Sequence, residues 1–333
     1  MTTIARVGLT EQRLPLHTPF VTALRRTTST ASVLVTITDS DGVTGTGEAP
    51  EVWPVTGESL PGIAACVRER LAPVLLGRDP AEYVTLLRRV RRAATGNHGA
   101  KAAVDVALHD LAARRLGVPL AVLLGGTPRR VPTDVTVAAD SAAVPKGFTV
   151  LKVKVGADAA GDLDRIAAVR AAAGPDARIR LDANQAWTPR AAVRMLDRIA
   201  AAGLDVEFVE QPVAAADLDG LAWVSERSGI PVMADESVFG VRDLVEVIRR
   251  RAADLVNVKL AKCGGLEPAR TLLGLAEAQG MGTMVGSMME GPVGVTAAAS
   301  LVAAYPTTVV SDLDAAWWLA DPVLDYADGH VLL

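Results

Sequence analysis

The sequence predicts an α/β protein in which a (β/α) barrel follows a smaller α+β unit. Three observations lead to this prediction. Strand-like segments recur from about residue 131 onward at intervals of roughly 20–30 residues, the length of one βα unit. Helical segments rich in Ala, Leu and Arg separate most of these strands. Before them, residues 1–125 begin with strands and continue with helices, a pattern typical of an α+β unit.

Size, charge and composition limit the classes of protein to consider. The chain has 333 residues, of which 50% are hydrophobic, so it can bury a large core. Its formal net charge is −4 and it has no basic tract, so no nucleic-acid partner is expected. No apolar run approaches the ~18 residues of a membrane span, so no membrane partner is expected. The oligomeric state stays open, and a homo-oligomer is compatible with the sequence.

Two features indicate a cytoplasmic protein. The N-terminal residues contain no apolar core of the kind that a signal peptide requires. The two cysteines, Cys66 and Cys263, have neither metal-binding nor redox spacing. A reducing, cytoplasmic setting is therefore expected.

The N-terminal unit is expected to contain a hairpin followed by helices. Residues 32–49 alternate in hydrophobicity on both sides of an Asp-Gly turn, which predicts two antiparallel strands. Residues 59–93 and 97–124 are predicted to be helical, and Gly117 and Pro119 interrupt the second helix. Together these segments would form one layered unit.

The barrel is assigned to residues 126–315. Its expected strands span residues 133–139, 150–155, 179–183, 206–212, 231–236, 254–260, 282–287 and 308–314. A doubly wound sheet is the alternative, but it requires a Gly-rich phosphate-binding turn after the first strand, and residues 136–143 do not provide one. The last unit lacks a clear closing helix. Its tail, residues 316–333, is therefore expected to return and pack on the N-terminal unit.

Lysine is rare in this chain and is concentrated in two strands. Of 34 basic residues only six are lysines, and four of these lie in the segments LKVKV and NVKLAK. Arg keeps its proton at any relevant pH, whereas Lys can lose it in a suitable environment. Lys152 and Lys154 also point to the same face of their strand. The lysine positions therefore indicate where lysine chemistry is needed.

Charged residues occur at the carboxyl ends of five consecutive expected strands. In chain order they are Lys154, Asp182, Glu210, Asp235 and Lys259, separated by 28, 28, 25 and 24 residues. Successive strand ends form a ring around one mouth of a barrel, where barrel enzymes place their chemistry. Asp182 could instead cap the following helix, but Thr188 is better placed to do so. The other lysine of the second segment, Lys262, is expected to be solvated or to support the ring.

This arrangement predicts metal-assisted proton transfer. Three converging carboxylates repel one another unless a cation lies between them, and oxygen ligands favour Mg²⁺ first and Mn²⁺ second. A substrate carboxylate bound to the metal would present its α-carbon between Lys154 and Lys259. A lysine whose pKa is lowered by neighbouring cations could then remove the α-proton, and the metal would stabilise the enediolate.

The segments LKVKV, RLDANQAW, FVEQP, MADES and NVKLAKCGG together resemble the signature segments of the enolase superfamily, muconate-lactonizing-enzyme subgroup. The resemblance extends over essentially the whole chain and implies a (β/α)7β barrel with an α+β capping domain. It implies that Lys154 and Lys259 form the acid/base pair and that Lys152 neutralises the bound carboxylate. The implied Mg²⁺ ligands are Asp182, Glu210 and Asp235. No His–Asp pair occurs on the late strands, unlike in the mandelate-racemase branch.

The expected eighth strand distinguishes activities within this subgroup. Asp312 and Asp314 lie two residues apart, as in the motif by which dipeptide epimerases hold the substrate α-amino group, and two carboxylates suit an ammonium group. The segment MVGSMMEGP, which contains Met289, is also similar to that group. The resemblance therefore implies a dipeptide epimerase, an isomerase that acts by 1,1-proton transfer. An N-acylamino-acid racemase, o-succinylbenzoate synthase or muconate-type cycloisomerase is the alternative, and a non-catalytic binding protein is a remote one.

Two loops of the N-terminal unit are expected to bind and recognise the substrate side chain, as the corresponding loops do in this family. The first, residues 17–30, resembles the loop of Ala-Glu epimerases in which an Arg pairs with the glutamate side chain. By position this is Arg25, with Arg26 beside it. The second, residues 51–59, contains Thr56 as an expected substrate contact. The expected small-molecule partner is therefore the dipeptide L-Ala-D/L-Glu.

Overall fold

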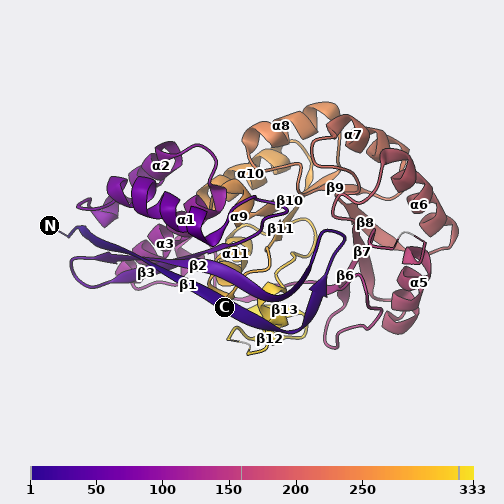
Figure 1. The fold of residues 1–333 in the computed structure, drawn as a ribbon, viewed down its shortest axis with the longest axis horizontal. Helices are drawn as coiled ribbons and strands as arrows, with labels where there is room; N and C mark the ends of the chain where they lie inside the picture. The colour runs from indigo at the N-terminus through magenta and orange to yellow at the C-terminus, as the bar shows by residue number, and fades with distance from the viewer. Residues whose placement is uncertain (1, 159, 322) are drawn as a thin grey trace.

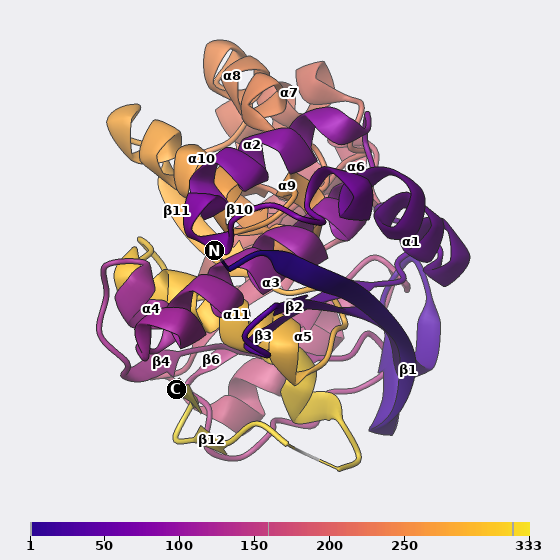
Figure 2. The ribbon, with the colours of Figure 1, turned by 90° about the vertical axis from the view of Figure 1, so that its left-hand side faces the viewer.

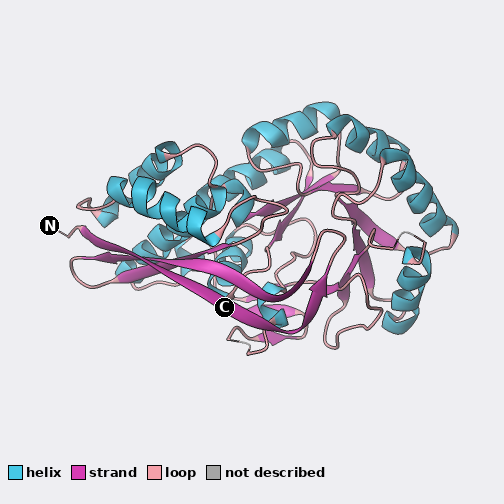
Figure 3. Ribbon diagram, in the orientation of Figure 1, coloured by secondary structure: helices cyan, strands magenta, loops and turns pink. Residues whose placement is uncertain are grey.

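The computed structural model describes residues 2–158, 160–321 and 323–333. An N-terminal unit lies beside a curled parallel sheet whose outer side is covered by an arc of helices (Figures 1 and 3). The predicted combination of a barrel and a separate α+β unit is confirmed.

The N-terminal unit is built on an antiparallel sheet with the strand order β1-β2-β3. Its strands are β1 (Ile4–Val21), β2 (Arg26–Asp39) and β3 (Thr44–Pro50). The predicted hairpin within residues 32–49 therefore forms, as β2 and β3. β1 and β2 are long enough to reach from this unit to the barrel, where their connection, residues 22–25, lies at the mouth (Figure 1).

Helices cover one face of this sheet. They are α1 (Leu60–Cys66), α2 (Tyr83–Ala93), α3 (His98–Leu116) and α4 (Leu120–Leu123). The region 59–93, predicted to be helical, is not continuously α-helical, because a π-helical turn (67–71) and two short 3-10 turns (72–74 and 80–82) separate α1 from α2. Two prolines explain the interruption. Pro73 is the second residue of one 3-10 turn and Pro80 is the first residue of the other, and both lack the N–H that a continuing helix needs.

The barrel strands are parallel and pair in sequence order from β5 to β11. They are β5 (Val135–Val137), β6 (Val150–Lys154), β7 (Arg178–Asp182), β8 (Val206–Glu210), β9 (Val232–Ala234), β10 (Leu255–Lys259) and β11 (Gly282–Gly286). The helices of the barrel are α5 (Asp162–Ala173), α6 (Pro189–Ala201), α7 (Leu218–Arg227), α8 (Val241–Arg250), α9 (Leu260–Cys263), α10 (Leu266–Ala278) and α11 (Pro292–Ala304). Thr188 caps α6 through its side chain, as predicted, which leaves Asp182 free for another role.

The expected eighth strand, residues 308–314, is not a regular strand. It closes the barrel through two isolated parallel bridges, from Ser311 to Thr133 and from Asp312 to Gly286. The side chain of Thr133 explains the irregularity, because its hydroxyl accepts the backbone N–H of Leu313 at 2.8 Å in place of a ladder carbonyl. A short 3-10 helix, residues 315–318, follows at once.

The C-terminal tail lies against both parts of the molecule. Trp317 and Trp318 contact the ring of His17 on β1, and Leu319 forms a bridge with Leu16. Further on, β12 (Tyr326–Ala327) and β13 (His330–Leu332) form a small sheet with β4 (Arg130–Pro132). In Figure 2, β4 and β12 are both found on the left, near the label of the C-terminus. The division at residues 125 and 315 stays a prediction.

Two carboxylates of the N-terminal unit reach into the barrel. Asp105 of α3 is 3% exposed and accepts the backbone N–H of Leu266, the first residue of α10, at 2.7 Å. Glu48 of β3 is equally buried and accepts the N–H groups of Gly291 and Gly294 at the start of α11. The two units are therefore joined by charged hydrogen bonds as well as by apolar packing. None of the described helices has the length and apolar character that crossing a lipid bilayer requires.

Candidate active site

Strand register brings the predicted strand-end residues to one level of the barrel. Lys154 of β6 pairs with Asp182 of β7, and Asp182 pairs with Glu210 of β8. Asp235 follows the end of β9, and Lys259 is the last residue of β10. All five are buried, with exposed fractions between 0% and 7%. The ring that the βα spacing predicts is therefore present at the carboxyl ends of the strands.

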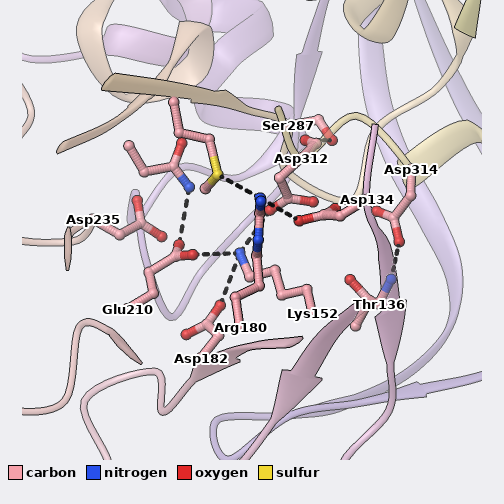
Figure 4. A network of polar contacts seen from close by, with 12 residues as sticks. Asp134, Thr136, Lys152, Arg180, Asp182, Glu210, Asp235, Ser287, Asp312 and Asp314 are labelled. Atoms are coloured by element: carbon pink, nitrogen blue, oxygen red, sulfur yellow. Dashed lines mark hydrogen bonds and ion pairs between the residues drawn. The ribbon is translucent and has the colours of Figure 1, made fainter. Parts of the chain in front are cut away.

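Lys152 lies at the centre of these charges (Figure 4). Its side chain is fully buried, and its Nζ lies 3.1 Å from Asp182 Oδ2 and 2.7 Å from Glu210 Oε2. Its third partner is Asp312, whose Oδ2 lies 2.6 Å away. Burial alone would lower the pKa of Lys152, but these carboxylates raise it well above its ordinary value. Lys152 is therefore a fixed cation that links the ring to the irregular eighth segment.

The two proposed acid/base lysines each contact a different carboxylate. Lys154 Nζ lies 2.5 Å from Asp182 Oδ2, and Lys259 Nζ lies 2.7 Å from Asp235 Oδ2. Both lysines line the same cavity, although β7, β8 and β9 separate their strands. Gly286 makes room for Lys259, because a Cβ at residue 286 would lie 2.9 Å from Lys259 Cε. The lysines therefore reach one space from different sides of the barrel.

The buried carboxylates differ in how easily they lose their protons. Burial would raise the pKa of Asp182, but Lys152 and Lys154 lower it to about 2. The pKa of Asp235 is likewise held well below its usual range, because Lys259 and Lys262 outweigh burial. Glu210 behaves in the opposite way, since burial and the neighbouring Asp182 raise its pKa to about 8. Protein groups alone therefore do not compensate all three negative charges.

The direction of the lysine pKa shift expected from the sequence differs from the direction that the surrounding protein groups produce. A lysine pKa lowered by neighbouring cations was expected. For Lys259, burial acts in that direction, but the carboxylate of Asp235 outweighs it and raises the pKa. A cation held by the carboxylates would oppose this effect, because it would offset their negative charge.

The three carboxylates fit a hard divalent cation. They supply only oxygen donors, as Mg²⁺ prefers. Glu210 Oε2 and Asp235 Oδ1 are buried and accept no hydrogen bond of acceptable geometry from the described residues, although ammonium groups lie close to them as ion pairs. As the side chains stand, no three His, Cys, Asp or Glu residues of the described ranges form a preformed metal cluster. Binding would therefore require the lysine ammonium groups to move off these oxygens.

Asp312 and Asp314 both line the cavity and are about 95% buried. The Oδ2 atom of Asp314 accepts the backbone N–H of Thr136 at 2.6 Å and Trp318 Nε1–H at 3.0 Å. The Oδ2 atom of Asp312 accepts from Lys152. No hydrogen bond from the described residues reaches Oδ1 of either carboxylate. Each aspartate is thus held through one oxygen and keeps the other for a further donor.

Only some of the residues that were predicted to contact the substrate line the cavity. Arg25, in the connection between β1 and β2, lines the cavity, and its guanidinium forms no ion pair with any described residue. Its neighbour Arg26 is exposed and pairs with Asp140 at 3.0 Å. Met289 also lines the cavity. Thr56 does not line it in this structure, because its hydroxyl donates to Val52 O at 3.2 Å.

Several residues of the site were missed or misjudged from the sequence. Of the two expectations for Lys262, solvation is wrong because the residue is fully buried, whereas support of the ring agrees with the contacts of its Nζ to Asp235 Oδ1 and Asn257 O. Asn257 donates to Glu210 Oε1 at 2.9 Å. Glu236 lines the cavity beside Asp235, and one of its oxygens is buried without a described partner. Strand alternation could have identified Asn257, which shares the inward face of Lys259.

Comparisons with known proteins cover almost the whole chain. Residues 4–125 match the family model "Mandelate racemase / muconate lactonizing enzyme, N-terminal domain", and residues 134–333 match "Enolase C-terminal domain-like". An L-Ala-D/L-Glu epimerase from Bacillus subtilis (strain 168) is 41% identical over 97% of this chain and 91% of its own length.

Solved structures agree with these matches. The substrate-liganded complex of the L-Ala-D/L-Glu epimerase from Bacillus subtilis superposes with a TM-score of 0.95 at 40% identity, covering 99% of this chain and 96% of that one. A dipeptide epimerase from Enterococcus faecalis V583, complexed with Mg and the dipeptide L-Leu-L-Tyr, gives a TM-score of 0.93 at 34% identity, covering 99% and 97%.

Proposed function

Because this chain belongs to the mandelate racemase/muconate lactonizing enzyme family of the enolase superfamily, we propose that it is a Mg²⁺-dependent dipeptide epimerase. It inverts the α-carbon of the C-terminal residue of a dipeptide, with L-Ala-D/L-Glu as the substrate. One observation carries the proposal above all others. Lys154 and Lys259 line one cavity from separate strands, next to three buried carboxylates and the Asp312/Asp314 pair.

Asp182, Glu210 and Asp235 would hold the Mg²⁺ ion, and Mn²⁺ is the second choice for the same oxygen donors. When bound, the ion would supply positive charge against the negative charge that develops on the substrate carboxylate. Lys152 adds a permanent positive charge beside this carboxylate. Its carboxylate partners support this role, because they outweigh the effect of burial and keep it protonated.

The two remaining lysines would carry out the proton transfer. One lysine removes the α-proton from one face of the α-carbon, and the protonated other lysine delivers a proton to the opposite face. Because the roles exchange for the opposite epimer, the reaction is reversible and consumes no co-reactant. The separation of Lys154 and Lys259 on β6 and β10 supports a two-base scheme.

The remaining cavity residues would select the substrate. The free Oδ1 atoms of Asp312 and Asp314 would accept the N–H groups of the substrate ammonium. The guanidinium of Arg25 would pair with the side-chain carboxylate of the C-terminal glutamate, which its burial at the cavity favours. Met289 would contribute to the cavity wall. Thr56 would reach the substrate only if its loop moved, because it lies outside the cavity lining.

The proposal extends to the partners and the cellular location of the protein. We propose a small-molecule partner and neither a nucleic-acid partner nor a membrane partner. The cysteines Cys66 and Cys263 are both free and buried, which is consistent with a reducing, cytoplasmic location. A homo-oligomer is compatible with the proposal, which does not depend on the oligomeric state.

Deuterium incorporation in ²H₂O tests the proposed function directly. The protein is incubated with a library of dipeptides and N-acylamino acids, with Mg²⁺ or with a chelator, and mass spectrometry follows uptake at the α-carbon. We expect Mg²⁺-dependent uptake and inversion, strongest for L-Ala-L-Glu and L-Ala-D-Glu. A preference for N-acylamino acids would indicate the racemase alternative. No metal-dependent uptake with any compound would indicate a non-catalytic binding protein.

A further inference from the structure

Glu48 is buried at the junction between the N-terminal unit and the barrel. Its Oε1 atom accepts hydrogen bonds from Ser32 Oγ at 2.7 Å and Gln12 Nε2 at 3.1 Å, both in the N-terminal sheet. The same oxygen also accepts the backbone N–H of Gly291 at 2.8 Å, and Oε2 accepts that of Gly294 at 3.0 Å. One carboxylate thus joins strands β1 and β2 to the first turn of α11.

The first turn of α11 depends on a side chain from elsewhere. Its N-cap residue is Gly291, which has no side chain, and no side chain within the helix caps its N–H groups. Such groups need acceptors, and a carboxylate at this end is favoured by the helix dipole. A Cβ at residue 291 would lie 2.8 Å from Glu48 Oε1. Glycine at this position therefore allows the close approach of Glu48.

The turn before α11 forms part of the cavity wall. Ser287, Met288 and Met289 all line the cavity between β11 and α11. Thr30 of β2 donates its hydroxyl to Met289 O at 2.6 Å, which is a second connection from the N-terminal sheet. Thr30 and Glu48 do not line the cavity themselves. The position of this wall is consequently set by groups outside the cavity.

We propose that Glu48 is a positioning residue that holds the wall formed by residues 287–289 against the bound substrate. It acts through the first turn of α11 and is assisted by Thr30. This inference rests on the proposed function, because it assigns the wall to substrate binding. Glu48 makes no hydrogen bond to the lysines or carboxylates on β6–β10. Its loss should therefore impair binding far more than proton transfer.

The test compares two carboxylates that accept backbone N–H groups at helix N-termini. Asp217 accepts the N–H of Gly220 at 2.8 Å at the start of α7, but it does not line the cavity. Glu48→Gln places an amide where four donors require an acceptor. We expect it to raise KM for L-Ala-D/L-Glu by about tenfold, the size expected for one charged hydrogen bond, with little change in kcat. Asp217→Asn should leave KM unchanged.

Hydrogen–deuterium exchange supplies a readout that does not depend on activity. The amides of Gly291 and of residues 293–295 should exchange about tenfold faster in Glu48→Gln and at the wild-type rate in Asp217→Asn. Thr30→Val, which removes only the hydroxyl bond to Met289 O, should raise KM in the same direction by a smaller factor. An unchanged KM in Glu48→Gln, or equal KM changes in Glu48→Gln and Asp217→Asn, would overturn the proposal. So would unchanged exchange at residues 291–295.

The two proposals fail in distinguishable ways. If the wild-type protein epimerises no dipeptide, the proposed function is wrong. The calorimetric Kd of the same dipeptides for wild type and Glu48→Gln then decides the positioning role. A Kd that the substitution leaves unchanged, or the absence of binding to the wild type, would overturn it.

Discussion

Lys152 and Asp312 form a buried ion pair across the barrel interior, with Nζ 2.6 Å from Oδ2. The sequence suggested separate partners for them, a substrate carboxylate for Lys152 and a substrate ammonium for Asp312. Their contact means that the two charged ends of the substrate site are electrostatically coupled. Lys152 also contacts Asp182 and Glu210, so the loss of Asp312 alone would leave it with two partners.

Removing the charge of Asp312 should weaken dipeptide binding selectively. We expect Asp312→Asn to raise KM for L-Ala-D/L-Glu by about tenfold or more, because a charged hydrogen bond to the substrate ammonium is lost. N-acetylated dipeptides, which lack the ammonium, should be affected less. Asp140→Asn removes the same charge from an exposed ion pair and should leave KM unchanged for both the free and the N-acetylated dipeptides. Equal losses for both substrate classes would argue against an ammonium site.

Replacing either proposed acid/base lysine should separate inversion from exchange. Lys154→Ala and Lys259→Ala should each lower epimerisation by at least about a thousandfold, because each removes a general acid/base. Each variant should still exchange the α-proton of one epimer with ²H₂O, and the two variants should act on opposite epimers. NMR measures the exchange of the α-proton when each epimer is supplied separately. Lys146→Ala, at an exposed position, is the control. A variant that inverts at near wild-type rate would contradict the two-base scheme.

Arg25 and Arg26 offer a matched pair for testing side-chain recognition. Arg25→Met should lower kcat/KM for L-Ala-D-Glu by roughly 100-fold, since a partly desolvated charged pair is lost. It should change kcat/KM for a dipeptide with an uncharged C-terminal residue much less. Arg26→Met should have little effect on either substrate, because Arg26 is exposed and pairs with Asp140. If Arg26→Met selectively lowered kcat/KM for the glutamate substrate, recognition of the glutamate side chain would have to be assigned to Arg26 instead of Arg25.

Metal binding should be visible as stabilisation of the folded protein. Saturating Mg²⁺ should raise the Tm of the wild type by roughly a few degrees, because a ligand that binds only the folded state stabilises it. Glu210→Gln should abolish this shift, while Asp205→Asn, an exposed substitution just before the same strand, should retain it. Calorimetry of thermal unfolding with Mg²⁺ and with a chelator gives the comparison. An unaltered shift in Glu210→Gln would remove this residue from the metal site.

Glu290 should make stability depend on pH. Burial, together with nearby Glu48, raises its pKa from 4.5 to about 8, although Met288 N–H and Lys259 oppose the increase. A carboxyl with a raised folded-state pKa stabilises the fold below its unfolded pKa, and this contribution is lost as pH rises through the folded value. Glu290→Gln should therefore raise Tm relative to wild type near pH 8 and not near pH 4.5. A constant Tm difference across this range would contradict the assignment.

The barrel and its charged ring could be predicted because both depend on short-range regularities. Strand alternation places Lys152 and Lys154 on one face, and βα spacing brings Asp182, Glu210 and Lys259 to successive strand ends. These regularities depend little on the rest of the fold. The resemblance to a known family then indicated the activity of a protein with this charged ring, and the comparisons support that activity.

Other features could not be predicted because they depend on contacts between distant segments. Residues 308–314 alternate like a strand, but the hydroxyl of Thr133 captures a backbone N–H that a ladder would use. Lys262 lies on a short helix, where solvation is the usual outcome, yet Asp235 and Asn257 enclose it. The capping of α10 by Asp105 likewise joins residues 161 positions apart. Only the assembled structure defines such partners.

The bonds of Asp105 and Glu48 to the barrel have a consequence for biosynthesis. Both carboxylates leave the ribosome before their N–H donors at residues 266, 291 and 294 are made. Until then, the N-terminal unit contains two carboxylates with only part of their partners, Ser32 and Gln12 for Glu48 and His109 for Asp105. It can therefore complete its packing only after most of the barrel has been translated, so a nascent chain truncated before residue 266 should remain protease-sensitive even in the segment containing Asp105.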